Sequence, residues 1–377
     1  MIKRVICIPD SFKGTLSSSQ IINITKSVFK KHNPDIEVLG IEVADGGEGT
    51  VDAFLSISKG RKVNHSASGP HFEKIDSFYG ILPGNVAVIE MAACAGLPLV
   101  KDNPNPLITT TFGVGELMIS AYENGCQKMI IGLGGSSTND GGCGAAVALG
   151  FKFFDETNQE FIPTGGTLSR IHRIDNSNVH PLVQGTQIIT MCDIDNPLYG
   201  ESGAAYVFGP QKGADSVTVP LLDEGLRNLS SRFEIDLNKC VSDIPGSGAA
   251  GGMGGGMVAF FNSTLQSGIE TILDIANFDE LIKGCDLIIT GEGRIDTQSL
   301  RGKVPVGVSR RAKKLGIPVL CVVGSIGDGI DEVYHQGITS IISINNQPVD
   351  FSISKSYAVE NLTITMNNLV RLLINSK

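Results

Sequence analysis

The chain has 377 residues, of which 46 are glycine and 41% are hydrophobic, a composition typical of a soluble α/β protein with many tight turns. Its net charge of −9, from 30 Lys and Arg against 39 Asp and Glu, argues against nucleic acid and anionic membranes as partners but allows a small anionic substrate. No apolar run reaches the length of a signal peptide or membrane span, and the eight cysteines lack disulfide-type or metal-type spacing. We therefore expect a cytoplasmic protein with reduced thiols.

The N-terminal segment predicts a buried strand over residues 5–8 that ends in a polar turn. Asp10, Ser11 and Lys13 follow Pro9 and so lie at the carboxyl end of that strand, which is where open α/β sheets bind ligands. Lys13 has a second interpretation, as a solvated loop lysine. Ser17 and Gln20 then form a capping-box pattern that predicts the start of a helix.

A second strand, predicted over residues 36–43, runs into an acidic loop that contains Asp45 and Glu48 between glycines. Crowded carboxylates repel unless a cation or hydrogen-bond donor lies between them, so a metal ion, a lysine or a substrate hydroxyl is the expected partner. The alternative is a turn with acidic residues at the start of the next helix.

The run from Met129 to Leu149 predicts a strand, a loop of glycines and hydroxyls, and a helix of small residues. Glycines at 132, 134 and 135 remove side chains that would keep a ligand from the backbone, and the polar residues 136–139 precede a helix N-terminus. Such a loop suits phosphate oxygens, and Asp140 adds a carboxylate where Mg²⁺ would lie. Because the loop matches neither the Walker A spacing nor G-x-G-x-x-G, a tight connection without a ligand is the alternative.

Two further loops carry charge in glycine-bearing turns, after an irregular stretch over residues 151–183. A strand over residues 188–192 leads to Asp193 and Asp195, and Lys212 then lies between two glycines. Residues 246–257 are the densest glycine segment, which predicts either direct phosphate contact or a hinge or small-residue helix.

The last third alternates strand and helix, with strands over residues 286–290, 318–323 and 340–344 and helices over residues 306–315 and 356–373. This alternation predicts a mostly parallel sheet with helices on both faces. We expect residues 1–80 and 277–377 to form one discontinuous Rossmann-like α/β domain, into which a second α/β domain of residues 81–276 is inserted.

The turn after the strand at 286–290 brings together Glu292, Arg294, Asp296 and Lys303. In phosphoryl transfer a protein mainly positions groups and neutralises charge. It needs acids for magnesium, cations for the transferred phosphoryl, glycine loops for phosphates and one carboxylate to accept the hydroxyl proton. The loops above supply all four, and so favour a kinase.

The sequence resembles the type I glycerate kinase family, the bacterial glycerate 2-kinases, over essentially its whole length. The motifs that carry the resemblance are PDSFKGTLS at residues 9–17, VADGGEGT at 43–50, GLGGSSTNDGG at 132–142, GPQKGA at 209–214, GSGAAGGMGGG at 246–256 and ITGEGRIDTQSLRGK at 289–303. The resemblance implies phosphorylation of D-glycerate to 2-phosphoglycerate with ATP and Mg²⁺. It also implies two α/β domains, one inserted in the other, with the active site in the cleft between them.

Residue roles are hypotheses within that resemblance. ATP phosphates would be held by Gly134, Gly135, Ser136, Ser137, Thr138, Asn139, Gly251 and Gly252. Magnesium would be held by Asp45, Glu48 and Glu292, and the catalytic groups would be Asp193 (the favoured base), Asp296, Lys13, Arg294 and Lys303. The substrate would contact Asp10, Ser11, Asp45 and Lys212.

Two other functions stay open at this point. A kinase of another small hydroxy acid or sugar acid would use the same groups. A non-catalytic sensor of a nucleotide or hydroxy acid would need the pocket alone, although a binder seldom needs several carboxylates beside an anion. The oligomeric state is undecided, and a homo-oligomer stays open.

Overall fold

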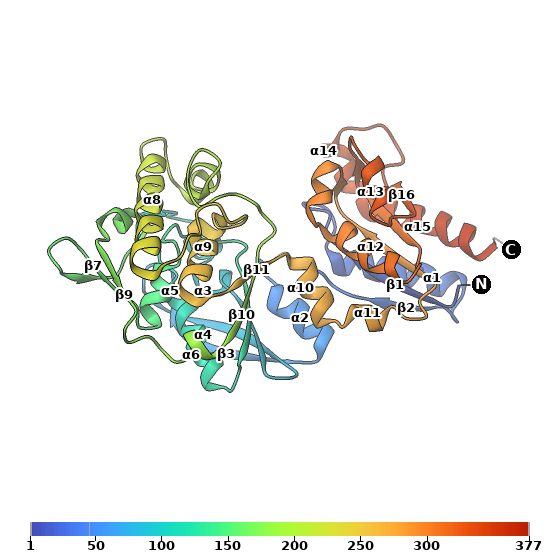
Figure 1. Ribbon diagram of the computed structural model, residues 1–377. Coiled ribbons are helices and arrows are strands. Elements are labelled where there is room, and N and C mark those ends of the chain that lie inside the picture. The colour runs from blue at the N-terminus through green and yellow to red at the C-terminus, as the bar shows by residue number, and fades with distance from the viewer. Residues whose placement is uncertain (1, 45, 376–377) are drawn as a thin grey trace. The chain divides into compact units, whose positions relative to one another are not determined.

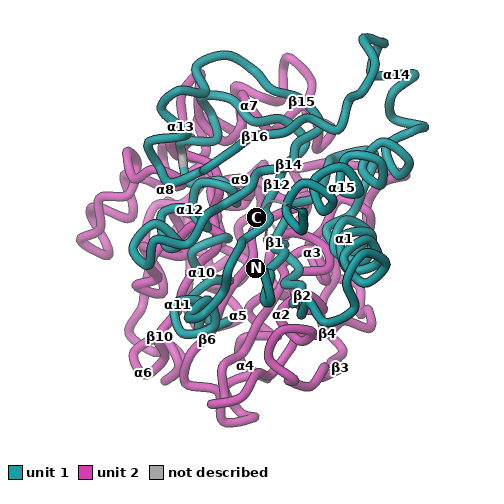
Figure 2. Tube along the Cα trace, turned by 90° about the vertical axis from the view of Figure 1, so that its right-hand side faces the viewer, with its two compact units in different colours: residues 1–44, 269–377 teal, residues 45–268 magenta. Residues whose placement is uncertain are grey.

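A computed structural model describes residues 2–44 and 46–375, and these residues fall into two compact units (Figures 1 and 2). Unit 1 comprises Met1–Ala44 and Ile269–Lys377, and unit 2 comprises Asp45–Gly268. Unit 2 is therefore an insertion in the sequence of unit 1. Both units combine helices with mostly parallel sheets, so the predicted α/β class is confirmed.

Unit 1 is built on a five-stranded sheet in which every pair is parallel. The strand order is β16-β14-β12-β1-β2. The strands are β1 (Arg4–Pro9), β2 (Glu37–Gly40), β12 (Leu287–Gly291), β14 (Val319–Val323) and β16 (Ser340–Ser343), with a separate parallel pair β13 (Arg294–Ile295) and β15 (Ser325–Ile326). The central strands are apolar and buried along their length, as expected for a sheet covered on both faces. The second strand is shorter than predicted.

Helices cover this sheet. They are α1 (Ser18–His32), α10 (Gly268–Ile275), α11 (Phe278–Leu281), α12 (Val304–Lys314), α13 (Asp331–His335), α14 (Phe351–Ser354) and α15 (Ala358–Asn375), with 3-10 turns η4 (Thr297–Arg301) and η5 (Lys355–Tyr357). Helix α1 begins at the predicted capping box of Ser17 and Gln20, which confirms that prediction. His32 of α1 is hydrogen-bonded to Asn367 of α15 at 2.9 Å, so the first and last helices lie side by side (Figure 2).

Unit 2 is built on a six-stranded sheet of order β11-β10-β6-β5-β4-β3. The strands are β3 (Arg61–Ser68), β4 (Lys74–Leu82), β5 (Val86–Glu90), β6 (Lys128–Gly132), β10 (Gln187–Met191) and β11 (Thr264–Gln266). The pairs from β5 to β11 are parallel, and β3–β4 and β4–β5 are antiparallel. The carboxyl ends of β5, β6 and β10 therefore share one edge.

In its remaining elements, unit 2 includes a group of aromatic side chains that belongs to the same hydrophobic core as the main sheet. Its helices are α2 (Thr50–Ser58), α3 (Ala92–Ala95), α4 (Phe112–Glu123), α5 (Cys143–Ala148), α6 (Leu182–Gly185), α7 (Ala204–Phe208), α8 (Thr218–Leu237) and α9 (Ala249–Phe261), with 3-10 turns η1 (Leu97–Val100), η2 (Gly165–Arg170) and η3 (Pro210–Lys212). The stretch predicted as irregular holds the small antiparallel sheet of β7 (Lys152–Phe154), β8 (Glu160–Phe161) and β9 (Arg173–Asp175). Phe151, Phe153, Phe233 and Phe261 gather around Phe260, which ties this sheet to α8 and α9.

The compact units differ from the predicted domain bounds at both boundaries. Residues 46–80, predicted in the first domain, lie in unit 2, and residues 269–276, predicted in the inserted domain, lie in unit 1. Strand β4 pairs with β5 and so extends the six-stranded sheet, and α2 packs on β4. An antiparallel hairpin added to a parallel sheet leaves no strong signal in local sequence patterns, because its partner strand is decided by the sheet edge that is available.

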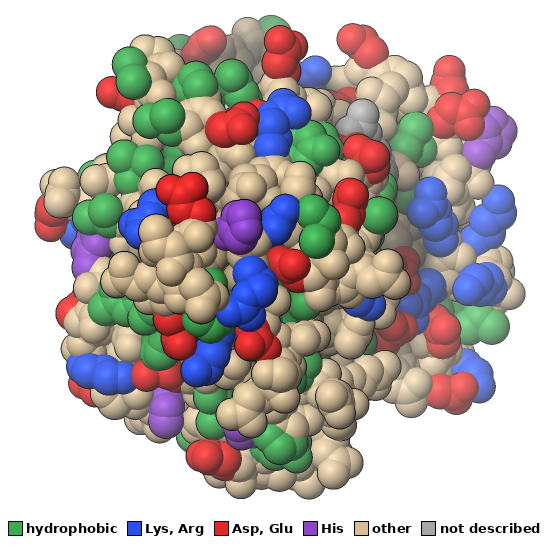
Figure 3. All heavy atoms as spheres, turned by 60° about the vertical axis from the view of Figure 1, so that its left-hand side comes forward, with side chains coloured by type: hydrophobic (Ala, Val, Ile, Leu, Met, Phe, Trp, Pro, Cys, Tyr) green, Lys and Arg blue, Asp and Glu red, His purple; other side chains and the backbone are tan. Residues whose placement is uncertain are grey.

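Among residues 2–44 and 46–375, no helix is long and apolar enough to span a membrane. Acidic and basic side chains are interspersed over the face shown in Figure 3, in line with the lack of any basic run in the sequence.

Candidate functional site

In unit 1, the polar residues predicted at strand ends gather at the carboxyl edge of β1 and β12. The backbone N–H of Asp10 donates to the Gly291 carbonyl at 2.8 Å, so the two strand-end turns run together. A Cβ built on Gly293 would lie 3.5 Å from the Phe12 Cα, which shows how closely the 291–294 turn lies against the segment that leads to Lys13. Residues 281 positions apart in the chain thereby share one edge of the sheet.

Glu292 is the buried acid of this edge. Its side chain accepts a hydrogen bond of 2.5 Å from the Ser299 hydroxyl and lies 3.4 Å from the Lys303 Nζ. Burial raises the pKa of Glu292 despite both partners, and the nearby charge of Asp10 acts in the same direction. Two acids and one cation are therefore held close together.

Arg294 and Asp296 form a more exposed pair beside it. The Arg294 Nε lies 3.2 Å from an Asp296 carboxylate oxygen, and the other oxygen accepts from the Gln298 backbone N–H at 2.9 Å. Asp296 thus caps η4, and the capping box is completed by the Ser299 hydroxyl, which accepts from the Asp296 N–H. The side chains of Arg294 and, in the turn after β1, of Lys13 are exposed and available to an anion.

In unit 2, two glycine loops lie in direct backbone contact. The Gly134 N–H donates to the Gly46 carbonyl at 2.9 Å. A Cβ on Gly132 would lie 2.3 Å from that carbonyl oxygen, and a Cβ on Gly134 would lie 2.5 Å from the Gly47 nitrogen. Only glycine permits this approach. The exposed Glu48 carboxylate lies 3.8 Å from the Cβ position of Gly135, so an acid stands beside the predicted phosphate loop.

The hydroxyl part of that loop is turned into the protein. Ser137 donates its hydroxyl to the Ala95 carbonyl at 2.9 Å and is 1% exposed. Thr138 and Asn139 are fully buried, and the Thr138 hydroxyl and both polar atoms of the Asn139 amide have no partner among the described residues. The exposed surface of the loop is formed by Gly134 and Gly135 instead.

Lys212 lies beneath this loop. Its side chain is 1% exposed, and its Nζ donates to the Ser136 hydroxyl at 2.8 Å and to the Thr138 carbonyl at 2.6 Å. No carboxylate of the described chain lies within ion-pair distance of it, and burial lowers its pKa to about 7, against a weaker opposing effect of Asp140. A lysine held by neutral acceptors beside a glycine loop is a natural partner for an anion.

Asp140, expected beside Mg²⁺, has a structural role instead. The fully buried carboxylate accepts hydrogen bonds from the N–H and hydroxyl of Thr111, both at 2.8 Å, and from the N–H groups of Gly142 and Gly144, both at 3.2 Å. Four donors fill the positions that a metal ion would need. The expectation of a magnesium ligand here is wrong, because the carboxylate is used in the hydrogen bonds that join α4 to α5.

Asp193 follows β10 and is exposed, and one of its oxygens accepts from the Gly268 N–H at 2.8 Å at the start of α10. Asp45 lies outside the described residues. Ser11 is half-buried, and its N–H donates to the Asp10 side chain at 2.6 Å.

The glycine-rich segment forms α9, whose beginning is distorted. Ala250, Gly251 and Gly252 have positive φ angles of 53°, 67° and 87°. A Cβ on Gly251 would lie 2.1 Å from the Thr138 carbonyl oxygen. The segment is therefore a close-packed helix of small residues that supports the loop over residues 136–142, one of the two predicted alternatives.

Several residues of these clusters went unnoticed in the sequence. Glu90 ends β5 with a buried carboxylate, and Ser299 and Thr111 donate to acids of the two sites. A lone acid at the end of an apolar strand, as in the VAVIE run, was the available signal for Glu90.

The acids that carry the magnesium hypothesis fit a metal ion that is held mainly by substrate. Among the residues that the structure describes, no three metal-ligating side chains are gathered at one point. Mg²⁺ commonly takes only one or two carboxylates and completes its shell with water and phosphate oxygens. Asp10 with Glu292, or Glu48 beside Gly135, can supply such oxygens, and neither set by itself forms an all-protein cage.

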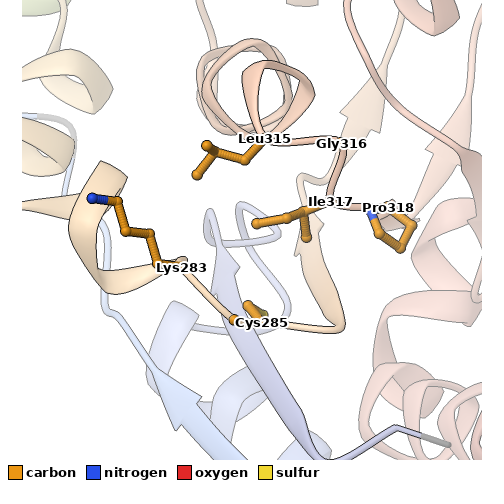
Figure 4. Close-up of a pocket in the computed structure, with 7 residues that line it drawn as sticks. Lys283, Cys285, Leu315, Gly316, Ile317 and Pro318 are labelled. Carbon is orange, nitrogen blue, oxygen red and sulfur yellow. The ribbon is translucent and has the colours of Figure 1, made fainter.

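A hollow of about 370 Å³ lies elsewhere, at the amino ends of β12 and β14 in unit 1 (Figure 4). Its lining consists of Lys283, Gly284, Cys285, Leu315, Gly316, Ile317 and Pro318. Apart from Lys283, its side chains are apolar or a thiol, and it lies at the edge of the sheet opposite Glu292.

The chain is similar to known proteins over nearly its whole length. The sequence profile described as the glycerate kinase family matches residues 5–374. A glycerate kinase from Bacillus cereus is 42% identical over 97% of both chains, and a glycerate 2-kinase from Escherichia coli is 42% identical over 90% of both. A crystal structure of a protein assigned as glycerate kinase 2 from Salmonella typhimurium LT2 superposes with a TM-score of 0.84 at 36% identity and covers 99% of both chains.

Proposed function

The chain belongs to the glycerate kinase family, and we propose that it transfers the γ-phosphoryl group of ATP to the secondary hydroxyl of D-glycerate, forming 2-phosphoglycerate. The observation that carries this proposal is the buried Lys212 under the 132–139 loop. The Lys212 ammonium donates only to neutral acceptors, the Ser136 hydroxyl and the Thr138 carbonyl. A buried cation without a carboxylate partner is costly unless an anion completes its surroundings. ATP phosphate oxygens or the glycerate carboxylate would meet that need.

The loop itself supports binding of a phosphate through its backbone. Gly134 and Gly135 form its accessible surface, and neither has a side chain that would hold a ligand away from the backbone. The Gly134 N–H is used in the hydrogen bond to the Gly46 carbonyl, so the Gly135 N–H is the one that we assign to a phosphate oxygen. The Ser136 hydroxyl, at the boundary between this surface and Lys212, accepts from the Lys212 Nζ. We assign phosphate contact to these three residues, and we assign Ser137, Thr138 and Asn139, together with Gly251 and Gly252, to the support of the loop.

The unit 1 cluster supports the transfer step. Lys303 and Arg294 would neutralise the transferring phosphoryl or bind the glycerate carboxylate, and exposed Lys13 is a third cation for the same anions. Mg²⁺, when bound, would neutralise charge on the phosphates, with Glu292 or Glu48 among its ligands. Asp193, exposed at the end of β10, is our candidate to accept the hydroxyl proton, with Asp296 the alternative.

The test is a coupled assay of ADP release with ATP, Mg²⁺ and D-glycerate, in which phosphorus NMR locates the phosphate on the product. Phosphate on the secondary hydroxyl supports the proposal, whereas phosphate on the primary hydroxyl keeps a glycerate kinase and overturns the position. If glycerate is not turned over but another hydroxy acid or sugar acid is, the result would favour a kinase of that other acid. Binding of nucleotide without any ADP release would favour a sensor.

The residue roles need variants of their own. Asp193→Asn and Asp296→Asn each keep the shape of the side chain and remove its charge. The variant that replaces the general base should therefore have a kcat lower by roughly a hundredfold or more. If both variants keep near-normal turnover, the assignment of the base to either residue fails. The half-exposed pair Lys152 and Glu160, on the small sheet of unit 2, offers a control: Glu160→Gln should leave turnover unchanged.

A further inference from the structure

Glu90 is a buried acid that the proposed chemistry has not yet used. It ends β5 in the middle of the six-stranded sheet and is 3% exposed. Its carboxylate accepts a hydrogen bond from the Val51 N–H at 2.9 Å and is also hydrogen-bonded to the backbone of Gly49. Val51 is the second residue of α2 and Gly49 is its N-cap residue, so Glu90 supplies the side-chain cap that Gly49 cannot provide.

The cap comes from a different strand, and this has a geometric consequence. The residue before the cap, Glu48, belongs to the loop that is bonded through Gly46 to the Gly134 N–H. Holding the first turn of α2 therefore fixes one end of the acidic loop, and the contact between Gly46 and Gly134 fixes the other. The backbone of Glu48 is thereby held between two fixed points, and its carboxylate lies beside Gly135.

The segment that follows Glu90 holds the second loop as well. The Met91 N–H donates to the Gly132 carbonyl at 3.0 Å, and the Ser137 N–H donates to the Ala95 carbonyl at 2.9 Å. The Leu97 N–H donates to the Gly135 carbonyl at 2.8 Å. Residues 91–97 are thus hydrogen-bonded to the phosphate loop through their backbone, and the Glu90 side chain is hydrogen-bonded to the residues that end the acidic loop.

We propose that Glu90 is a positioning residue that sets where the Glu48 carboxylate stands relative to the 132–135 loop, and thereby tunes binding of a magnesium–nucleotide complex. The inference rests on the proposed function in that the loop binds phosphate. Glu90 itself touches neither nucleotide nor metal, because its carboxylate is enclosed between β5 and α2.

The experiment compares Glu90→Gln with Glu116→Gln by calorimetric titration of ADP with and without Mg²⁺. Glu116 is a matched control: it accepts from the Ser68 N–H at 2.5 Å and lies 2.6 Å from Lys74, in the same unit but on α4. Glu90→Gln leaves one side-chain oxygen for two backbone N–H donors, so we expect the Mg²⁺-dependent gain in ADP affinity to fall by roughly tenfold. Glu116→Gln should lower thermal stability and leave the Mg²⁺-dependent gain in ADP affinity unchanged.

A double variant separates positioning from general loosening. If Glu90 acts through Glu48, Glu90→Gln should have little further effect on Mg²⁺-dependent ADP binding in a Glu48→Gln background. Additive losses, or an unchanged gain in the single Glu90→Gln variant, would overturn the inference. Should Glu90→Gln fail to fold, Glu90→Asp keeps the charge but withdraws it from α2, and a smaller loss in the same direction is expected.

This readout does not depend on glycerate. If the wild-type protein binds ADP with Mg²⁺ but phosphorylates no hydroxy acid, the proposed reaction fails while the role of Glu90 is still decided by the titrations. If glycerate is phosphorylated and the Glu90→Gln titration matches the wild type, the inference alone fails.

Discussion

Replacement of Lys212 by methionine tests the energetic cost of burying its charge. Methionine keeps the unbranched chain and removes the ammonium, which lies at 2.8 Å from the Ser136 hydroxyl and 2.6 Å from the Thr138 carbonyl. The pKa of Lys212 falls from 10.5 to about 7 on folding because burial disfavours the charged form. The native protein therefore holds this proton less tightly than the unfolded chain does.

The sign of the pH effect follows from that difference. Below pH 7 the lysine is charged in both states, and the full cost, roughly 5 kcal/mol, opposes folding. As pH rises from 7 toward 10.5 the native lysine becomes neutral first, so the cost is relieved and stability rises. Between pH 6 and pH 9 the relief is roughly 3 kcal/mol. Lys212→Met has no such charge and should lack this gain.

The assay is urea denaturation of both proteins at several pH values, with the transition of unit 2 followed separately because a two-unit protein need not unfold in one step. The difference in unfolding free energy between wild type and Lys212→Met cancels the other titrating groups. It should change in favour of the wild type by roughly 3 kcal/mol from pH 6 to pH 9. Parallel pH curves for the two proteins would refute the account of a buried, unpaired cation.

The same variant also bears on activity. If Lys212 completes an anion site, its loss should lower kcat/KM by roughly a hundredfold, the value of a hydrogen bond to a charged group. Unchanged kcat/KM with the expected stability curve would leave Lys212 as a purely structural cation.

Three other substitutions and one matched control test the supporting structure and the buried acid of unit 1. Gly251→Ala should lower the free energy of unfolding by roughly 3–5 kcal/mol, because φ at this position is 67° and the added Cβ would meet a backbone oxygen. The matched control Gly284→Ala, at a φ of 72° in open space, should lower it by only about 1–2 kcal/mol. Equal shifts in melting temperature for the two variants would contradict this. Asp140→Asn should lower unfolding free energy by about 2–4 kcal/mol in denaturant titrations, since an amide cannot accept from four donors; a wild-type midpoint would refute that role. Lys303→Met should raise the pKa of Glu292, because Lys303 lowers it, and so move the acid limb of the kcat/KM profile to higher pH; an unmoved limb would separate Glu292 from catalysis.

Much of the architecture can be predicted from the sequence because it depends on local patterns. The apolar runs of β1, β12 and β14, the capping box at Ser17 and the strand–loop order of the polar residues are all periodic or positional signals. The parallel sheet follows from strand–helix alternation. These signals also indicate that acids and cations at strand ends meet at one edge, as Asp10 and Glu292 do.

Tertiary structure alone decided which polar groups stay exposed at the strand ends and which are used to support the fold. Asp140 and Glu292 both follow strands in glycine-bearing turns. Asp140 accepts from four donors of its own unit, whereas Glu292 accepts from the Ser299 hydroxyl and lies beside the Lys303 ammonium. The hydrogen-bond partners of a carboxylate come from segments distant in the chain, as Thr111 does for Asp140 and Val51 does for Glu90. Residue types and spacing determined the family of chemistry, but burial and long-range contacts, which no local pattern encodes, decided the role of each acid and of Lys212.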